Sequence, residues 1–185
     1  MKTGRRPAPA AGHRFASRPG RCMKQLIAIL ILVAGIPAGP ARSGSAISVV
    51  DFGIYKLSID HRTKAPQTVA GGRNVVSNIR IFRRTRTVFA QLGRNFGYRF
   101  RIADPTLLGR QLTLRTAFPP LHDPKTGRRG TSQSRPFMPL SNGVYFVGYR
   151  FDFMWELAEG LWRFQLLDGE TLLHEEVLRV VVPLN

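Results

Sequence analysis

Cysteine is almost absent from this 185-residue chain, which contains only Cys22. Cys22 lies near the N-terminus, ahead of the part of the sequence whose pattern predicts a fold. A disulfide framework, a thiol nucleophile and a cysteine-ligated metal are therefore excluded from the folded part. With 43% hydrophobic residues, the chain has the composition of a globular protein and is long enough to bury a core without cross-links.

Acidic residues are also scarce, with 11 Asp and Glu against 28 Lys and Arg. Residues 1–46 hold eight of the basic residues and no acid, so nearly half of the net charge of +17 lies outside the part expected to fold. Within residues 61–150 the acids are Asp104 and Asp123 alone, whereas residues 151–185 hold seven acids and two arginines. The predicted domain is therefore basic over most of its length and acidic toward its C-terminal end.

No apolar run reaches the roughly 20 residues that a membrane-spanning helix needs. The longest run begins at Leu26, follows a basic residue and is soon interrupted by two prolines and a stretch of small residues. This order is typical of a secretory signal, with cleavage after Ala41 or after Ala46. The sequence therefore predicts a signal peptide over residues 23–46 and a periplasmic or secreted mature chain without a membrane span. An uncleaved anchor is the alternative.

Residues 1–22 are rich in Arg, Pro and Ala and show no periodicity, which predicts an unstructured basic extension. Translation from Met23 would leave this stretch out of the protein, so both Met1 and Met23 stand as candidate start codons. A twin-arginine export signal at Arg5 and Arg6 is disfavoured, because Pro-Ala-Pro follows the pair and the apolar run lies far from it.

Helical spacing is missing as well, and an alternation with a period of two takes its place from Ile47 onward. In "FGYRFRI" (residues 96–102) aromatic and aliphatic residues alternate with glycine and arginine, and "YRFDFMW" (149–155) and "LWRFQLL" (161–167) repeat the pattern. Such alternation is typical of antiparallel strands with one face in the core. An Asp-Gly pair at 168–169 predicts a closing hairpin.

These patterns predict an all-β domain built as a sandwich or barrel. Loops are expected at 61–73 and at 118–141, and the second is long enough to be a contact surface. The predicted strands are 48–56, 74–83, 86–91, 96–103, 111–117, 143–155 and the hairpin of 161–167 with 171–182.

Three stretches share a further pattern: "VVDFGIYKL" (49–57), "LGRNFGYRF" (92–100) and "GYRFDFMWELAEGLWRFQLLDGETLLHEEVLRV" (148–180). In them the chain resembles a bacterial family of secreted domains of unknown function. The resemblance implies an antiparallel, immunoglobulin-like β-sandwich of about seven strands over residues 47–185, preceded by a signal peptide, and it implies no activity. Leu178 stands where the family has an aromatic residue, a difference that concerns packing.

Catalytic motifs are lacking. There is no G-x-S-x-G element, and His61, His122 and His174 lie in separate segments. His122 and Asp123 share a loop and are the candidates for a metal-dependent hydrolase site, which is the least favoured alternative.

Paired carboxylates are no better supported. Glu156 and Glu159 flank a predicted turn, while Glu175 and Glu176 are adjacent on a strand and therefore face opposite sides. Neither arrangement favours two-carboxylate catalysis. The sequence predicts a non-enzymatic protein without a cofactor or a metal site.

Arginine is what the sequence has in excess. Guanidinium groups bind phosphate and sulfate oxygens, so a basic sheet face is one interpretation of this excess. The candidate polyanion-binding residues are Arg80, Arg83, Arg84, Arg86, Arg99 and Arg101. A solvated sheet face is the favoured interpretation, because the aromatic residues between these arginines point to the core and cannot stack on bases. Acidic strands can also neutralise basic neighbours.

The favoured hypothesis is therefore an exported, non-enzymatic binding or structural module of the bacterial envelope. Its partner would be an envelope protein or an anionic polymer, with nucleic acid disfavoured. A polyanion-binding protein that uses the arginine-rich face is the first alternative.

Overall fold

The structure, a computed structural model, describes residues 45–183. The predicted basic extension (1–22) and nearly all of the predicted signal peptide (23–46) lie outside the described residues. Within the described part the chain forms nine strands and two single-turn 3₁₀ helices, and none of its helices has the length and hydropathy of a membrane span. The strands are β1 (Ile47–Lys64), β2 (Gly72–Arg84), β3 (Thr87–Phe89), β4 (Asn95–Ile102), β5 (Leu112–His122), β6 (Arg129–Phe137), β7 (Tyr145–Arg150), β8 (Gly160–Asp168) and β9 (Thr171–Val181); the 3₁₀ helices are η1 (Pro105–Leu107) and η2 (Met154–Glu156).

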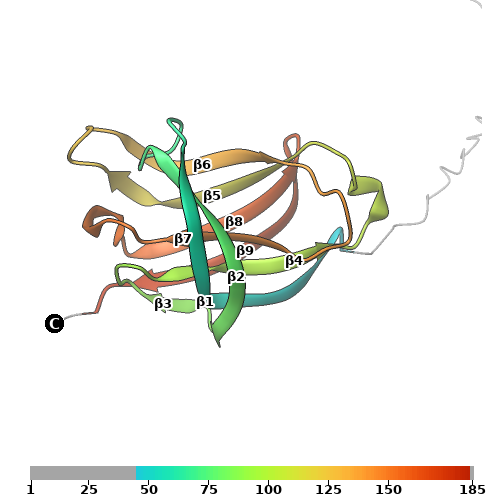
Figure 1. Cartoon of the computed structure of the whole chain (residues 1–185), viewed down its shortest axis with the longest axis horizontal. Coiled ribbons are helices and arrows are strands. Elements are labelled where there is room, and N and C mark those ends of the chain that lie inside the picture. The colour runs from blue at the N-terminus through green and yellow to red at the C-terminus, as the bar shows by residue number, and fades with distance from the viewer. Residues whose placement is uncertain (1–44, 184–185) are drawn as a thin grey trace, which may run out of the picture. The chain divides into compact units, whose positions relative to one another are not determined.

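The strands form two sheets, shown in Figure 1. One has the strand order β2-β1-β4-β7 and the other β3-β9-β8-β5-β6. Neighbouring strands are antiparallel except β3 and β9, which run parallel. The prediction of an all-β antiparallel sandwich is confirmed, and so is the closing hairpin, which is β8 and β9.

Aromatic residues from both sheets meet in one core, as the period of two predicts. Phe96, Tyr98 and Phe100 of β4 are fully buried, and so are Trp162 and Phe164 of β8. The rings of Phe96 and Trp162 meet edge to face with their centroids 5.3 Å apart. Burial of each large side chain contributes about 1.5–3 kcal/mol, so these contacts hold the sheets together.

The β1–β2 hairpin is long and bent. Three register shifts interrupt its pairing, and Asn78 at one of them has a φ of 50°, a left-handed conformation that asparagine tolerates. Such irregularities bend a strand pair. In Figure 1 the distal part of the hairpin crosses in front of the other strands toward β5 and β6. Val69 at its tip is buried and lies against Gly130 at the start of β6, so the hairpin bridges the two sheets.

Two predicted loops are wrong in extent. The loop predicted at 61–73 is confined to 65–71, because β1 continues to Lys64 and β2 begins at Gly72. The loop predicted at 118–141 contains the end of β5 and all of β6, the strand that the sequence missed. Much of the distal hairpin and of β6 is exposed and polar, so neither segment carries an alternation of apolar and polar residues.

The strand predicted at 143–155 is also too long. Strand β7 ends at Arg150, and the backbone N–H groups of Asp152 and Phe153 donate to the buried carboxylate of Glu156, which turns the chain into η2. Phe153, predicted to face the core, is instead 39% exposed.

The fold distinguishes the two predicted cleavage sites. The carbonyl oxygen of Ala46 accepts hydrogen bonds from the N–H groups of Ala103 (3.0 Å) and Asp104 (3.2 Å), and the next residue, Ile47, is buried. Cleavage after Ala46 would remove this acceptor and place a new ammonium group beside the core. We therefore expect processing after Ala41, so that N-terminal sequencing of the protein exported from a bacterial host reads Arg42 first.

One substitution checks this expectation. Ala41→Phe should block processing, because a signal peptidase needs a small residue before the cut. An exported protein that begins at Ile47 would contradict the expectation, as would normal processing of the Ala41→Phe variant.

Candidate ligand-binding pocket

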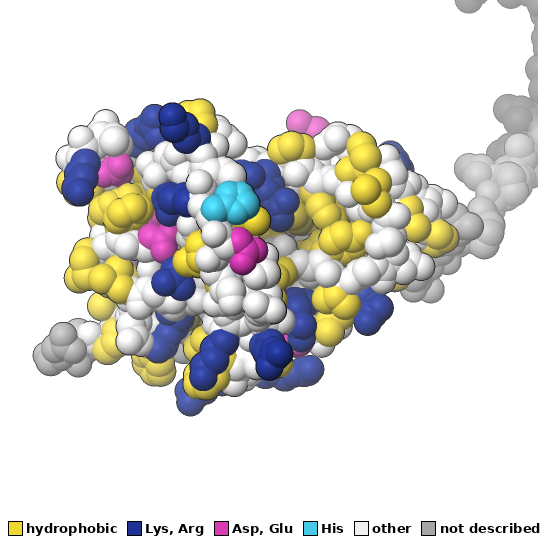
Figure 2. All heavy atoms as spheres, viewed as in Figure 1, with side chains coloured by type: hydrophobic (Ala, Val, Ile, Leu, Met, Phe, Trp, Pro, Cys, Tyr) yellow, Lys and Arg dark blue, Asp and Glu magenta, His cyan; other side chains and the backbone are white. Residues whose placement is uncertain are grey.

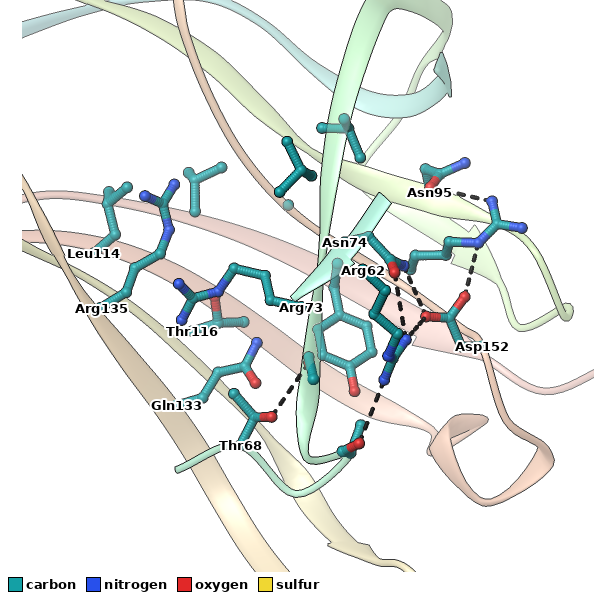
Figure 3. Close-up of a pocket in the computed structure, with 18 of the residues that line it drawn as sticks. Arg62, Thr68, Arg73, Asn74, Asn95, Leu114, Thr116, Gln133, Arg135 and Asp152 are labelled. Atoms are coloured by element: carbon teal, nitrogen blue, oxygen red, sulfur yellow. Dashed lines mark hydrogen bonds and ion pairs between the residues drawn. The ribbon is translucent and has the colours of Figure 1, made fainter. Parts of the chain in front are cut away.

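A cavity of about 350 Å³ lies under the bent hairpin, where the edge strands β7 and β6 belong to different sheets and do not pair. Its lining residues come from β1, β2, β5, β6 and β7, from the hairpin tip, from the start of β4 and from the segment between β7 and the end of η2, and Figure 3 shows most of them. The lining combines apolar side chains such as Leu57, Val76 and Leu114 with charged and amide groups. A cavity of this size and mixed lining accommodates a small organic ligand.

At one end of the pocket Asp152 binds polar side chains from the three strands β1, β2 and β7. Its carboxylate accepts from the guanidinium groups of Arg62 (2.9 Å) and Arg150 (2.8 Å) and from the amide of Asn74 (2.8 Å), as the dashed lines in Figure 3 show. Both arginines therefore have a carboxylate partner, and the network ties the hairpin to the segment that follows β7.

Beneath this network lies Glu156, which is 2% exposed. Its carboxylate accepts from the Tyr149 hydroxyl (2.7 Å) and from the N–H groups of Asp152 (2.6 Å) and Phe153 (2.9 Å). Burial raises the pKa of Glu156, although these hydrogen bonds favour its ionised form. These partners come from its own turn and from the end of β7, so Glu156 fixes the turn against that strand, while Glu159 is exposed and does not pair with it.

On the opposite wall Arg73 of β2 and Arg135 of β6 have no such partner. In Figure 3 both guanidinium groups lie on the side of the pocket near Thr116 and Leu114, and no dashed line reaches either of them. Within residues 45–183 neither side chain makes a hydrogen bond or an ion pair.

The two charges influence each other. Burial lowers the pKa of Arg135, and the positive charge of Arg73 lowers it further, which places the two groups within electrostatic reach. Arginine nevertheless stays protonated in a protein. This wall of the pocket therefore holds two like charges, neither of which has an ion-pair partner in the described part of the chain.

Sequence reasoning missed both arginines. Arg73 falls in the predicted loop 61–73, and Arg135 falls in the predicted loop 118–141, so neither was assigned to a strand or to a shared site. The one sequence feature that pointed to this region was the length of the predicted loop 118–141, which indicated a contact surface. The meeting of the two side chains depends on the bend of the hairpin, which no local pattern encodes.

The six arginines singled out by the sequence lie in different environments. Arg86 pairs with Glu176 at 3.0 Å and lies over the ring of Phe52, and Arg99 pairs with Asp51. The remaining four are exposed, namely Arg80, Arg83, Arg84 and Arg101. On the face drawn in Figure 2, Lys and Arg side chains are spread widely, with acidic side chains among them.

Arg99 belongs to a buried polar cluster on the outer face of its sheet. Its guanidinium donates to both carboxylate oxygens of Asp51, and the Tyr55 hydroxyl donates to Asp51 Oδ1 at 2.6 Å. Asp51 is only 3% exposed, and the hydrogen bonds from Arg99 hold its pKa below the ordinary value. Arg99 therefore stabilises the pairing of β1 with β4, and its guanidinium is already engaged.

The candidate metal site at His122 and Asp123 lies at the end of β5. His122 is exposed, whereas the Asp123 carboxylate accepts from the Thr126 hydroxyl (2.7 Å) and the Lys125 N–H (2.9 Å), which lowers its pKa. In the described part of the chain, no three His, Cys, Asp or Glu residues are grouped as metal ligands. Asp123 shapes a turn, and the hydrolase alternative finds no support in its geometry.

A solved structure has a similar fold. It is an immunoglobulin-like protein from Pseudomonas aeruginosa, with a TM-score of 0.53 and 22% sequence identity, and the match covers 75% of this chain and 100% of that chain. The domain described here is therefore an immunoglobulin-like β-sandwich, as the sequence predicted.

The sequence itself defines the family. The model of a domain of unknown function, DUF3859, matches residues 44–180, and the chain belongs to this family. No curated protein matches the sequence. The resemblance to a family of sandwich domains of unknown function is confirmed to this extent, and neither comparison indicates catalysis.

The Asp51–Arg99 pair gives a prediction for stability. Asp51→Asn should lower the free energy of unfolding by about 2 kcal/mol at pH 7, because a buried charge-assisted hydrogen bond is lost. Since the pKa of Asp51 is lower in the folded state than its ordinary 3.8, the contribution is present above pH 3.8 and is lost as the pH falls through the folded value.

Urea denaturation at pH 7 and at about pH 2.5 measures this difference. The gap between wild type and Asp51→Asn should narrow at the lower pH, while the exposed control Asp60→Asn should stay close to wild type at both. If the difference in unfolding free energy between wild type and Asp51→Asn is the same at both pH values, the ion pair is not its origin.

Proposed function

We propose that this protein is an exported, non-catalytic binding module of the bacterial envelope whose ligand binds in the pocket between the hairpin and strands β5, β6 and β7. One observation carries the proposal: Arg73, Gln133 and Arg135 line the cavity, and none of their side chains makes a hydrogen bond within the described residues. Partly buried polar groups without partners cost stability, so their presence around a cavity favours a ligand.

Binding is favoured over catalysis by what surrounds the acidic groups of the pocket. Asp152 accepts hydrogen bonds from two arginines and an asparagine, and Glu156 accepts from Tyr149 and two backbone N–H groups. A general base directs a lone pair at its substrate. Each of these carboxylates already accepts three hydrogen bonds that hold the fold, out of about four that a carboxylate can accept.

Export is supported by the sequence ahead of the domain. The basic start, short apolar run and small residues of 23–46 have the order of a secretory signal. The near absence of cysteine means that the domain needs no oxidative step to fold after export.

A fragment screen by two-dimensional NMR tests the pocket. Ligands should shift the backbone amide signals of Asn74, Val76 and Gly148, which line the cavity, and leave those of β3 unchanged. Gln133→Trp should abolish the shifts by filling the cavity, whereas Ser132→Trp, on the opposite face of β6, should not. Shifts scattered over both sheets, or shifts that survive Gln133→Trp, would contradict the proposal.

A second candidate function, polyanion binding, retains one specific observation. Arg80, Arg83, Arg84 and Arg101 are exposed, and within the described residues none of them pairs with a carboxylate. In Figure 2 basic side chains gather at the lower edge of the molecule, where Figure 1 shows the end of β2. Exposed guanidinium groups attract polyanions through a field that salt screens.

Heparin binding at two salt concentrations tests this candidate. Affinity should fall at least tenfold between about 50 and 200 mM salt, and the double variant Arg83→Ser/Arg84→Ser should weaken it further. Arg179→Ser, which removes an exposed arginine from the other sheet, serves as the control. If Arg179→Ser lowers heparin affinity as much as Arg83→Ser/Arg84→Ser does, the binding reflects net charge and not a site at the end of β2.

A further inference from the structure

We propose that the pocket binds a small organic anion, with Arg73 and Arg135 together holding its carboxylate or phosphoryl group. This inference rests on the proposed function and adds the chemical class of the ligand. It follows from the way the chain partners its other arginines, from the charges around the cavity and from the apolar part of its lining.

The other partly buried arginines all have acceptors. Seven arginines of the described residues are partly buried, and five of them donate to a carboxylate, an amide oxygen or a backbone carbonyl. The five are Arg94, Arg99, Arg115, Arg150 and Arg163. The two exceptions are Arg73 and Arg135, and both line the same cavity.

An anion between these two groups would resolve an unfavourable arrangement. Two partly buried positive charges repel each other, and neither forms an ion pair within residues 45–183. A guanidinium group presents two parallel N–H donors that match the oxygens of a carboxylate or a phosphoryl group. Two such groups on the same wall, one from β2 and one from β6, can both donate to one oxyanion.

The rest of the cavity sets the form of the ligand. Leu57, Val76, Leu114 and Phe146 give part of the wall an apolar character, which suits a short hydrocarbon or aromatic body. At the other end the positive charges of Arg62 and Arg150 are paired with Asp152, so the unpaired positive charge that attracts an anionic group lies at Arg73 and Arg135. With about 350 Å³ available, the cavity takes a small molecule and not a polymer.

Matched probes on the exported, processed protein test the inference. Benzoate and phenyl phosphate carry the two oxyanions on one aromatic body, and benzamide is the neutral counterpart. Calorimetric titration at constant ionic strength should show at least one anion binding tenfold or more tightly than benzamide. The preferred anion then distinguishes a carboxylate ligand from a phosphoryl ligand.

Arginine variants on β2 and β6 distinguish an effect of the pocket from an effect of the protein's net charge. Arg73→Gln and Arg135→Gln should each weaken anion binding at least tenfold and raise the melting temperature of the ligand-free protein by about 2–4 °C, because the repulsion is removed. Arg80→Gln on β2 and Arg129→Gln on β6 are exposed controls and should change neither quantity. Arg135→Lys keeps the charge and should still lose affinity, because it lacks the paired donors.

The outcomes distinguish the two proposals. If benzamide binds in the pocket as tightly as the anions, and the arginine variants bind as wild type does, the anion inference is wrong while the binding function stands. If no probe binds and the NMR screen finds no ligand at the cavity, both are wrong. A lower melting temperature for Arg73→Gln and Arg135→Gln would show that the two arginines serve the fold, and would overturn the inference.

Discussion

The two sheets are held together by aromatic rings that meet between them, with Phe96 of β4 edge-on against Trp162 of β8. The position of the pocket depends on the same contact. Tyr149 of β7 packs on Trp162 with ring centroids 4.6 Å apart, lines the cavity and donates its hydroxyl to Glu156. The inner wall of the pocket is thus the rim of the core, which gives a binding site the rigid support that a surface loop lacks.

The strand order brings the basic and acidic regions of the sequence into contact. Acids from the C-terminal part of the domain pair with arginines from its middle, as in Arg86 with Glu176 and Arg62 with Asp152. These pairs join segments that are distant in the sequence, so the basic and acidic regions of the chain become neighbours in the fold. Most arginines without an acid are exposed, and the partly buried Arg94 and Arg115 donate to backbone or amide oxygens instead. The two in the cavity, Arg73 and Arg135, are partly shielded from water and have no acceptor within the described residues, so their charges have a larger energetic effect than exposed ones.

The sequence predicted the core well because burial on one face of a strand leaves a period of two, and Phe96, Tyr98, Trp162 and Phe164 all follow it. It predicted the distal hairpin poorly because distal β1 is exposed along its length, and it missed β6 because polar residues such as Gln133 and Arg135 occupy half-buried positions of that strand. The pocket could not be predicted for a related reason. Arg73 and Arg135 approach each other only after register shifts bend the hairpin across the sandwich, and such shifts depend on pairing between strands and not on local composition.

The position of β9 has a consequence for how the chain folds. It lies between β3 and β8, and its parallel pairing brings Arg179 beside Thr87, far away in the sequence. The five-stranded sheet therefore cannot be completed until residues 171–181 have been synthesised, and closing so long a loop makes folding slow. A chain that stays unfolded while it is being made can still pass through a membrane channel, so this strand order is compatible with the export proposed above.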